Sequence, residues 1–527
     1  MRPRGEKMVT GPIFRHHFLE NLPGLLIGVV VLIVLAVAAS GTASDPDLWG
    51  HVRFGQDILA ARAVAGHDPY SFTSDRPWVN HEWLAEVLMA AAYGTAGSAG
   101  LIALKWALAM SAFGILWLAL RRAGVFQPVA AGLLLMAVVG TYGQMMTVRP
   151  QLFSMLLYTI LLALLNAAGR GRWRLLLWMP VLFGFWANLH GGWIVGLGVL
   201  GLWSACALFA PRVGRVFRPG AVEVWSPGSS DPGSALWAAG SVALAIAGTL
   251  ATPYGLELWA FLWETVGLGR ADITEWQPLT SEPLFLMAWA ATASLIVLAW
   301  RRRGWAALPV LLPAVAVGAL ASRVARLEGF FALTNVMLLA PCFASFGPER
   351  LPLSRRPTRA DMATVGAMCL AGLVATGIAV KSRAGCVTVV GPDAEETWAP
   401  EAEAIMFLQS NPIRGRLLTY FDYGELAIWH LAPRLLVSYD GRRETVYSDA
   451  VQKAHQRFYS KTPDASYARL LKADYIWLPH RLPVIGLLER DGWVAIFRGS
   501  RSVVLAREAG PYTQPAPWTG PRCFPGP

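Results

Sequence analysis

Long apolar runs separated by short polar segments dominate the first 380 residues. A helix that crosses a bilayer core needs about 20 predominantly apolar residues. Eleven ranges satisfy this pattern when flanking charges are used to set their ends: 22–40, 99–119, 125–144, 152–168, 175–189, 191–210, 236–252, 283–300, 305–321, 329–346 and 361–380. The pattern predicts a polytopic α-helical membrane protein with about 11 transmembrane helices.

The apolar runs stop near residue 380, and the remaining sequence is typical of a small soluble α/β domain. A helix is predicted over 402–409, and short strands are predicted over 417–421, 435–439, 475–478, 493–497 and 502–506. The last dozen residues are rich in Pro and Gly, which predicts a loose tail. We therefore divide the chain into a transmembrane domain, 1–380, and a C-terminal domain, 381–527. The first outer loop, about 41–98, is expected to hold two interfacial helices.

Basic residues alternate between the two predicted sides of the membrane. With the N-terminus inside, the inner segments carry 19 Lys or Arg residues and the outer loops before residue 381 carry seven. Cytoplasmic loops carry the excess of Lys and Arg. The alternation therefore predicts a cytoplasmic N-terminus and an extracytoplasmic C-terminal domain.

Composition supports a membrane protein. Apolar types make up 55% of the chain and charged types 15%, which excludes a disordered, collagenous, coiled-coil or disulfide-rich small protein and argues against a soluble cytoplasmic enzyme. The net charge of +11 does not imply nucleic acid, because cytoplasmic loops account for it. Cys386 and Cys523 flank the polar C-terminal region and could pair if that region faces an oxidising compartment.

Ionisable residues gather on the predicted outer side. Outside the N-terminal tail, every His before residue 381 falls there, and acids and arginines including Glu275 join them at span ends. The span centres are nearly free of charge. Ionisable groups near a membrane interior mark pathways or sites, so this distribution indicates chemistry at one face rather than an ion path through the spans.

The first candidate string is Ser44–Arg53, directly after the first span. Asp45 suits a helix N-cap, Pro46 the first helical position, and Asp47 the positive end of the helix dipole. A carboxylate fixed there also suits a general base, and His51 lies four residues after Asp47 on one helical face. A plain helix start and a catalytic carboxylate both remain open.

The second string contains His81 and Glu82, which line a pocket if a helix starts with Asn80 as its cap. Trp78 and Trp83 in the same string suit an aromatic belt at the membrane interface or a platform for a sugar.

The third group consists of arginines on the outer side. Arg149 precedes a proline, and Arg323 and Arg326 are spaced to share a helical face. Arg binds phosphate with two parallel hydrogen bonds, and anchoring of lipid headgroups is the alternative. His190, followed by two glycines, is either a structural residue or part of the site.

Motifs for other chemistry are absent. The sequence has no HExxH or CxxC spacing, no Walker loop, no GxSxG, and no GxGxxG after a strand. No cofactor is expected to be required, and a divalent metal ion is left open.

These residues resemble the GT-C superfamily of membrane glycosyltransferases, which includes protein O-mannosyltransferases, the aminoarabinose transferase of lipid A and the catalytic subunit of oligosaccharyltransferase. Asp45-Pro46-Asp47-x-Trp49 is similar to the acidic motif that opens their first outer loop. The likeness runs through 45–55, 77–83, 149–151, 186–192, 274–276, 323–331 and 439–447, and within the superfamily it is nearest to a group of bacterial multi-pass proteins. The sequence departs from the Asp-Glu pair of the aminoarabinose and mannosyl enzymes, so the choice of base and any metal requirement stay open.

The resemblance implies an inverting transfer of a sugar from a polyprenyl-phosphate donor to a lipid, glycan or protein acceptor, outside the cytoplasm of a bacterial inner membrane. The base would be Asp45 or Asp47, with arginines at the lipid phosphate and no nucleic-acid partner. His51, His81, Glu82 and His190 would orient the substrate or the base. A transporter or flippase and a non-catalytic assembly subunit are the alternatives.

Two strings in the C-terminal domain, 421–425 and 439–444, each place an acid after a short apolar strand. They fit turns or an acceptor-recognition surface.

Overall fold

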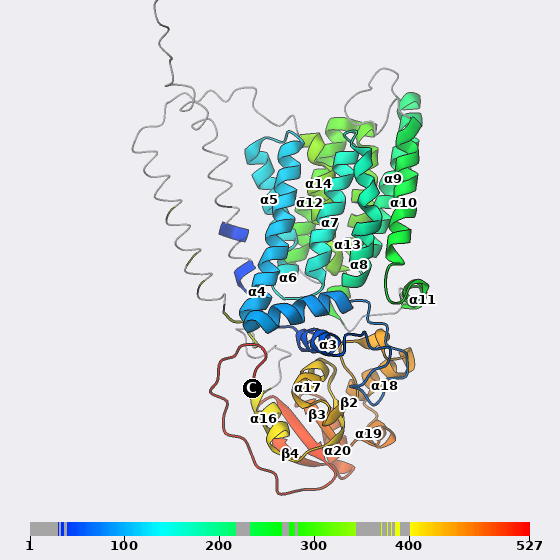
Figure 1. Cartoon of the computed structure of the whole chain (residues 1–527). Helices are drawn as coiled ribbons and strands as arrows, with labels where there is room; N and C mark the ends of the chain where they lie inside the picture. The colour runs from blue at the N-terminus through cyan, green and yellow to red at the C-terminus, as the bar shows by residue number, and fades with distance from the viewer. Residues whose placement is uncertain are drawn as a thin grey trace, which may run out of the picture.

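The computed structural model describes residues 30, 33–35, 39–217, 232–265, 273–279, 283–343, 370, 377, 381, 385–389 and 401–527. A helical body and a C-terminal domain are stacked on one another, and α3 (Leu48–Ala61) and the first part of α4 (Trp83–Arg122) lie crosswise between them (Figure 1). The candidate site residues of the first outer loop therefore lie in or next to the layer where the two parts meet.

Helices occupy the predicted spans from 99–119 to 329–346. They are α4, α5 (Gln127–Gly140), α6 (Tyr142–Met145), α7 (Gln151–Ala168), η1 (Trp173–Trp178), α8 (Met179–Leu189), α9 (Trp193–Phe217), α10 (Pro232–Thr249), α12 (Pro283–Arg303), η4 (Gly304–Ala307), α13 (Leu308–Arg323), α14 (Glu328–Leu338) and η6 (Ala340–Phe343). Within the described residues, α4 and α7 are long and apolar enough to cross a membrane. The predicted spans 22–40 and 361–380 lie almost entirely outside the described residues, so the number of eleven stays a prediction.

The first outer loop contains two helical segments, as predicted. The first is α3, and the second is the start of α4, which is separated from the rest of that helix by non-helical backbone at Ala96 and Gly97. Gly97 has φ +56°, a conformation that glycine adopts without a steric penalty. The kink turns the crosswise part of α4 into the part that rises through the body.

The start of α3 differs from the prediction. Asp45 Oδ1 accepts a hydrogen bond from the Asp47 backbone N–H at 3.0 Å, and the helix begins at Leu48 rather than at Pro46. The reason is local, because an Asp side chain that bonds to the backbone two residues ahead makes a turn before the helix instead of capping it. Asp47 takes the N-cap position without a side-chain cap bond.

The C-terminal domain is a five-stranded sheet covered by helices. Its strand order is β2-β1-β3-β5-β4, with β2 (Leu435–Val437), β1 (Gly415–Thr419) and β3 (Tyr475–Pro479) parallel and β5 (Ser502–Ala506) and β4 (Val494–Arg498) antiparallel. All five predicted strands are present, displaced by no more than two residues at either end. The helices are α16 (Ala402–Ser410), which was predicted, and α17 (Gly424–Leu431), α18 (Asp449–Tyr459), α19 (Ser466–Leu470) and α20 (Val484–Arg490), which were not.

Arg442 fastens this domain to the first outer loop. It follows β2 and forms ion pairs with Asp68 of the loop at 2.6 Å and with Asp440 at 2.7 Å. Its guanidinium carbon also lies 5.1, 5.3 and 4.9 Å from the ring centroids of Phe54, Tyr70 and Trp78. Trp78 is therefore a buried packing residue rather than the interface-belt residue that the sequence suggested.

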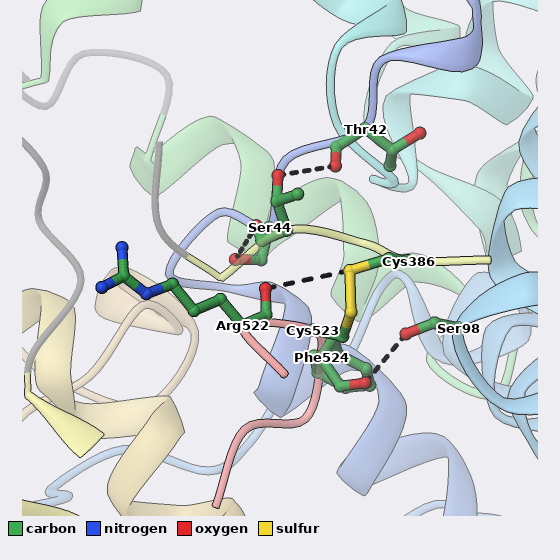
Figure 2. The surroundings of a disulfide bond; sticks show 8 residues. Thr42, Ser44, Ser98, Cys386, Arg522, Cys523 and Phe524 are labelled. Carbon is green, nitrogen blue, oxygen red and sulfur yellow. Dashed lines mark hydrogen bonds between the residues drawn. A yellow bond between two sulfur atoms is a disulfide. The ribbon is translucent and has the colours of Figure 1, made fainter. Parts of the chain in front are cut away.

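The C-terminal tail is ordered, contrary to the prediction. Cys386 and Cys523 form a disulfide, the pairing that the sequence left open, and Phe524 beyond it is buried (Figure 2). Trp49 Nε1 of α3 donates to the Pro525 carbonyl at 2.8 Å, and Ser98 Oγ of α4 donates to the Phe524 carbonyl at 2.8 Å. A buried aromatic anchor and a covalent link outweigh the Pro- and Gly-rich composition on which the prediction rested.

The segment that carries Asp45 is held from two sides. Thr388, close to the disulfide, donates its N–H to the Thr42 carbonyl at 3.0 Å and accepts from the Ser44 N–H at 2.9 Å. Lys105 of α4 is fully buried, and its ammonium group donates to the Gly41 carbonyl, Thr42 Oγ1 and the Met145 carbonyl. All three ammonium protons therefore take part in hydrogen bonds, and Lys105 holds the backbone just before Asp45 in place.

We predict that Arg442→Ala lowers the stability of the protein by about 3–5 kcal/mol, because Asp68 and Asp440 are left buried without their partner. The measurement is the thermal unfolding midpoint of the purified protein in detergent. Lys453→Ala, which removes an exposed ion pair with Asp449, is the matched control and should cost about 0.5 kcal/mol or less. Equal effects of the two substitutions would contradict a fastening role for Arg442.

Candidate functional site

Arg149 is the centre of a cluster of carboxylates. It lies in the turn before α7, and its Nη2 is 3.2 Å from Asp47 Oδ2 while its Nη1 is 2.7 Å from Glu275 Oε1. Its Nε pairs with Asp45 Oδ2. Glu275 belongs to η2 (Thr274–Trp276), so three separate segments of the chain meet at one guanidinium.

Burial makes this cluster sensitive to charge. Burial raises the pKa of Asp45 to about 6, and the neighbouring Asp47 acts in the same direction while Arg149 opposes both. Burial would lower the pKa of Arg149, but the surrounding carboxylates outweigh it and raise that pKa. For Glu275, burial opposes ionisation, but Arg149 and Arg326 outweigh it and lower its pKa. The arginines therefore hold Glu275 ionised, whereas Asp45 titrates near pH 6.

Arg326 provides a second guanidinium beside the first. It lies in η5 (Ala325–Leu327), and its Nη1 is 3.9 Å from Glu275 Oε2. When the Gln151 amide is oriented with its oxygen toward Arg326, that oxygen accepts from Arg326 Nε at 3.2 Å and from Nη2 at 2.6 Å. The Trp276 ring centroid lies 6.0 Å from the guanidinium carbon. Glu275 thus bridges two arginines through its two oxygens.

His190 has hydrogen-bond donors next to both of its ring nitrogens. The Gly192 N–H donates to His190 Nδ1 at 3.0 Å, and Ser154 Oγ lies 2.7 Å from the same atom. Ser154 Oγ in turn accepts from Trp186 Nε1 at 2.7 Å, so its own proton points to His190. Nδ1 is therefore an acceptor, while Nε2 lies 3.4 Å from Arg326 Nη2, a group that can only donate. Burial lowers the pKa of His190 to about 3, which keeps the ring neutral.

Glu82 lies close to two imidazoles, those of His81 and His190. Its Oε1 is 3.6 Å from His81 Nε2 and 3.8 Å from His190 Nε2. Burial would raise the pKa of Glu82, but the nearby histidines and Arg326 outweigh it and lower that pKa. The predicted helix start at Asn80 is displaced in the same way as at Asp45, because Asn80 Oδ1 accepts from the Glu82 N–H at 3.3 Å and α4 begins at Trp83.

His51 turns away from Asp47 and toward α4. Its Nδ1 lies 3.4 Å from Glu86 Oε1, and Glu86 Oε2 accepts from Asn80 Nδ2 at 2.6 Å. Burial alone would lower the pKa of His51, but Glu86, Glu82 and Asp47 outweigh it and raise that pKa to about 9. His51 is therefore a buried cation between the two strings that the sequence singled out.

The structure brings together eight of the nine predicted site residues. These are Asp45, Asp47, His51, His81, Glu82, Arg149, His190 and Arg326. Arg323 stands apart. It is exposed at the end of α13, and extended backbone at Val324 (φ −138°) separates it from Arg326, so the two do not share a helical face.

Sequence reasoning assigned no role to three residues that complete the cluster. Glu275 was noted only as an acid at a span end, and Glu86 and Gln151 were not singled out. Glu86 follows Glu82 by one helical turn, a spacing that places both on one face. Nothing in the sequence pairs Gln151 with Arg326, because they belong to helices that meet only in the folded chain.

The acidic side chains of the cluster surround the guanidinium group of Arg149. Among the described residues, no group of three or more His, Cys, Asp or Glu side chains is arranged to hold a metal ion. Asp45, Asp47 and Glu275 already have Arg149 as their cation. Arg149 therefore supplies the positive charge that these three carboxylates share.

An apolar groove of about 390 Å³ lies between α7 and α8. Its lining includes Phe153 and Leu189, which are the chain neighbours of Ser154 and His190. The groove therefore runs along the helical body and ends beside the polar cluster. It is lined by Phe153, Leu156, Leu157, Ile160, Leu164, Trp178, Val181, Leu182, Phe185 and Leu189.

Solved structures show what this fold is similar to. No protein-family model matches the sequence, and no curated protein matches it. ArnT from Cupriavidus metallidurans bound to undecaprenyl phosphate matches with a TM-score of 0.52 and 14% identity over 92% of this chain and 99% of that chain. The oligosaccharyltransferase of Archaeoglobus fulgidus, tethered with an acceptor peptide, matches with a TM-score of 0.50 and 14% identity over 86% of this chain and 69% of that chain. A likeness at this identity establishes the fold alone, and the chain therefore has the fold of these two proteins.

Proposed function

We propose that this chain is a membrane glycosyltransferase that moves a sugar from a polyprenyl-phosphate donor to a hydroxyl of an envelope acceptor. The observation that carries the proposal is the meeting of Arg149 and Arg326 with carboxylates directly before α7, the helix that lines one side of the apolar groove. An amphipathic substrate with a long hydrocarbon chain and an anionic head matches such a combination.

The donor would lie with its isoprenoid chain in the groove between α7 and α8 and its phosphate at the two arginines. Guanidinium groups suit this task because they stay charged and bind phosphate oxygens in pairs. Glu275, which bridges both arginines, occupies the position that the phosphate would take. ArnT, whose fold this chain shares, binds undecaprenyl phosphate, which supports a lipid phosphate here.

The reaction would be a single displacement with inversion at the anomeric carbon. The acceptor oxygen forms a bond to that carbon while the bond from the carbon to the phosphate oxygen breaks. The proton of the acceptor hydroxyl goes to a carboxylate, and the electron pair of the broken bond stays on the lipid phosphate. Arg149 and Arg326 stabilise the charge that grows on the departing phosphate.

Asp47 is the better placed of the two candidate bases. Its side chain is 30% exposed against 8% for Asp45. Both Asp45 oxygens are engaged, one by the Asp47 N–H and one by Arg149. A general base must first lie within reach of the proton that it takes, and its pKa matters after that. Asp47 therefore takes the proton, and Asp45 orients Arg149.

His81, Glu82 and His190 would bind the sugar. His190 Nε2 lies 3.8 Å from Glu82 Oε1, and an imidazole beside a carboxylate offers hydrogen-bonding atoms to neighbouring sugar hydroxyls. His51 is a positioning group through Glu86.

The site would face the periplasm of a bacterial inner membrane, with the C-terminal domain outside. The disulfide between Cys386 and Cys523 supports this orientation, because disulfides persist in oxidising compartments. The acceptor, a lipid, glycan or protein, would approach from the side of the C-terminal domain.

We expect Asp47→Asn to reduce sugar transfer by about 100-fold or more, since general-base catalysis contributes about 10²–10⁴-fold. The measurement is transfer from radiolabelled polyprenyl-phosphate sugar in membranes.

In the wild type the rate of sugar transfer should fall as the pH is lowered through about 6, because protonation of Asp45 releases Arg149. Asp45→Asn should remove that pH dependence and lower the rate at neutral pH. Full activity in both variants would remove the proposed base and favour a non-catalytic subunit.

We further expect Glu275→Gln to tighten binding of polyprenyl phosphate about tenfold. The substitution removes the carboxylate that competes with phosphate for Arg149 and Arg326, and a charged hydrogen bond between side chains is worth about 1.5–3 kcal/mol. The measurement is the Kd of the lipid phosphate for the purified protein. Glu257→Gln, at an acid outside the cluster, is the control. Weaker binding in Glu275→Gln would show that Glu275 supports the site instead of blocking it.

A further inference from the structure

Glu425 is a buried carboxyl that reaches from the C-terminal domain into the start of α3. It is the second residue of α17, it is 3% exposed, and its Oε2 accepts a hydrogen bond from the Gly50 N–H at 3.1 Å. Gly50 is the third residue of α3. The first amides of a helix have no partner within it, and Asp47 at the N-cap supplies no side-chain acceptor. Glu425 therefore caps α3 from another domain.

Two glycines make room for this contact. A Cβ on Gly50 would overlap Glu425 Oε2. On the opposite side, a Cβ on Gly441 would approach Glu425 Oε1 to 2.6 Å and Asp47 Oδ1 more closely still. Gly441 thus lies against Glu425 and Asp47 together, which places the buried carboxyl beside the proposed base.

The surroundings favour a neutral Glu425. Burial raises its pKa well above the ordinary value, and Asp47, Asp440 and Asp45 act in the same direction against Arg442. These are the charged groups that face it, two from the start of α3 and two from the turn after β2. A neutral carboxyl accepts with one oxygen and donates with the other, so Glu425 is suited to hold an amide on one side and a carboxylate on the other.

We propose that Glu425 is a positioning residue for the Arg149 cluster, a buried side chain from the C-terminal domain that caps α3 and fixes where Asp47 lies. The sheet explains how it arrives there. Glu425 follows β1 and Gly441 follows β2, and the carboxyl ends of neighbouring parallel strands lie at one edge of a sheet. Arg442 lies at the same edge. The contacts that dock the C-terminal domain and the contact that positions Asp47 therefore form together.

The effect on transfer depends on the function proposed above, whereas the capping of α3 does not. The test therefore has two readouts, amide hydrogen exchange in α3 and transfer kinetics. Glu425→Ala removes the cap, and Glu425→Gln keeps a neutral side chain that both accepts and donates. Gly441→Ala adds a methyl group that would overlap the carboxyl groups of Asp47 and Glu425. Ser98→Ala, which also removes one hydrogen bond between the helical layer and the C-terminal domain, is the matched control.

We expect Glu425→Ala to speed amide exchange in the first turns of α3 about tenfold, the size of one lost hydrogen bond. It should lower kcat at least tenfold with an unchanged KM for the donor, because the phosphate contacts stay in place. Glu425→Gln should keep at least a third of the wild-type kcat, and Ser98→Ala should match the wild type in both readouts. If Glu425→Ala does not accumulate, Gly441→Ala should show the same loss of kcat.

Two results would overturn the proposal. One is unchanged exchange in α3 for Glu425→Ala. The other is equal loss of kcat in the Gln and Ala variants, since it would mean that an ionised carboxylate is required. If the wild type transfers no sugar while exchange in α3 responds as expected, the proposed function fails and the capping role stands.

Discussion

Three carboxylates meet at the single guanidinium of Arg149, and the layer between the two parts of the molecule depends on that contact. Asp45 and Asp47 belong to one segment, and Glu275 lies far from them in the sequence. Neighbouring like charges repel unless a cation lies between them, so the Arg149 guanidinium links the start of α3, the start of α7 and the segment around η2. The positive charge that organises this cluster is also suited to receive an anionic substrate.

The C-terminal domain belongs to this arrangement and is more than an attachment. Leu48, Trp49 and Val52 of α3 share one hydrophobic cluster with residues of the sheet, and Arg442 and the disulfide add ionic and covalent links. The parallel strands direct their carboxyl ends toward α3. The turns after those strands were candidates for an acceptor-recognition surface, and in the folded chain they contact the helix that follows the acidic string.

Charge in the cluster is distributed for two tasks. Around Arg149 the acids and arginines are paired through Glu275, which the lipid phosphate of the proposed donor would displace. Around Glu82 the imidazoles differ in charge, because Glu86 keeps His51 cationic while burial keeps His190 neutral. Neutral and charged groups side by side are what a site needs if it is to hold an uncharged sugar next to a phosphate. The proposed function would use the two groups of residues separately, the arginines for the phosphate and the residues around Glu82 for the sugar.

The sequence by itself determined the helices of the body, the five strands of the C-terminal domain and the gathering of acids, histidines and arginines at one end of the helices. Each follows from local periodicity, which the chain carries wherever it folds. Only the tertiary structure decided that Arg326 joins the cluster while Arg323 does not, that Glu275 bridges the arginines, that Glu425 caps α3, and that the tail is anchored. Those outcomes depend on which residues meet across hundreds of positions, and no local pattern encodes the distance between side chains on different elements.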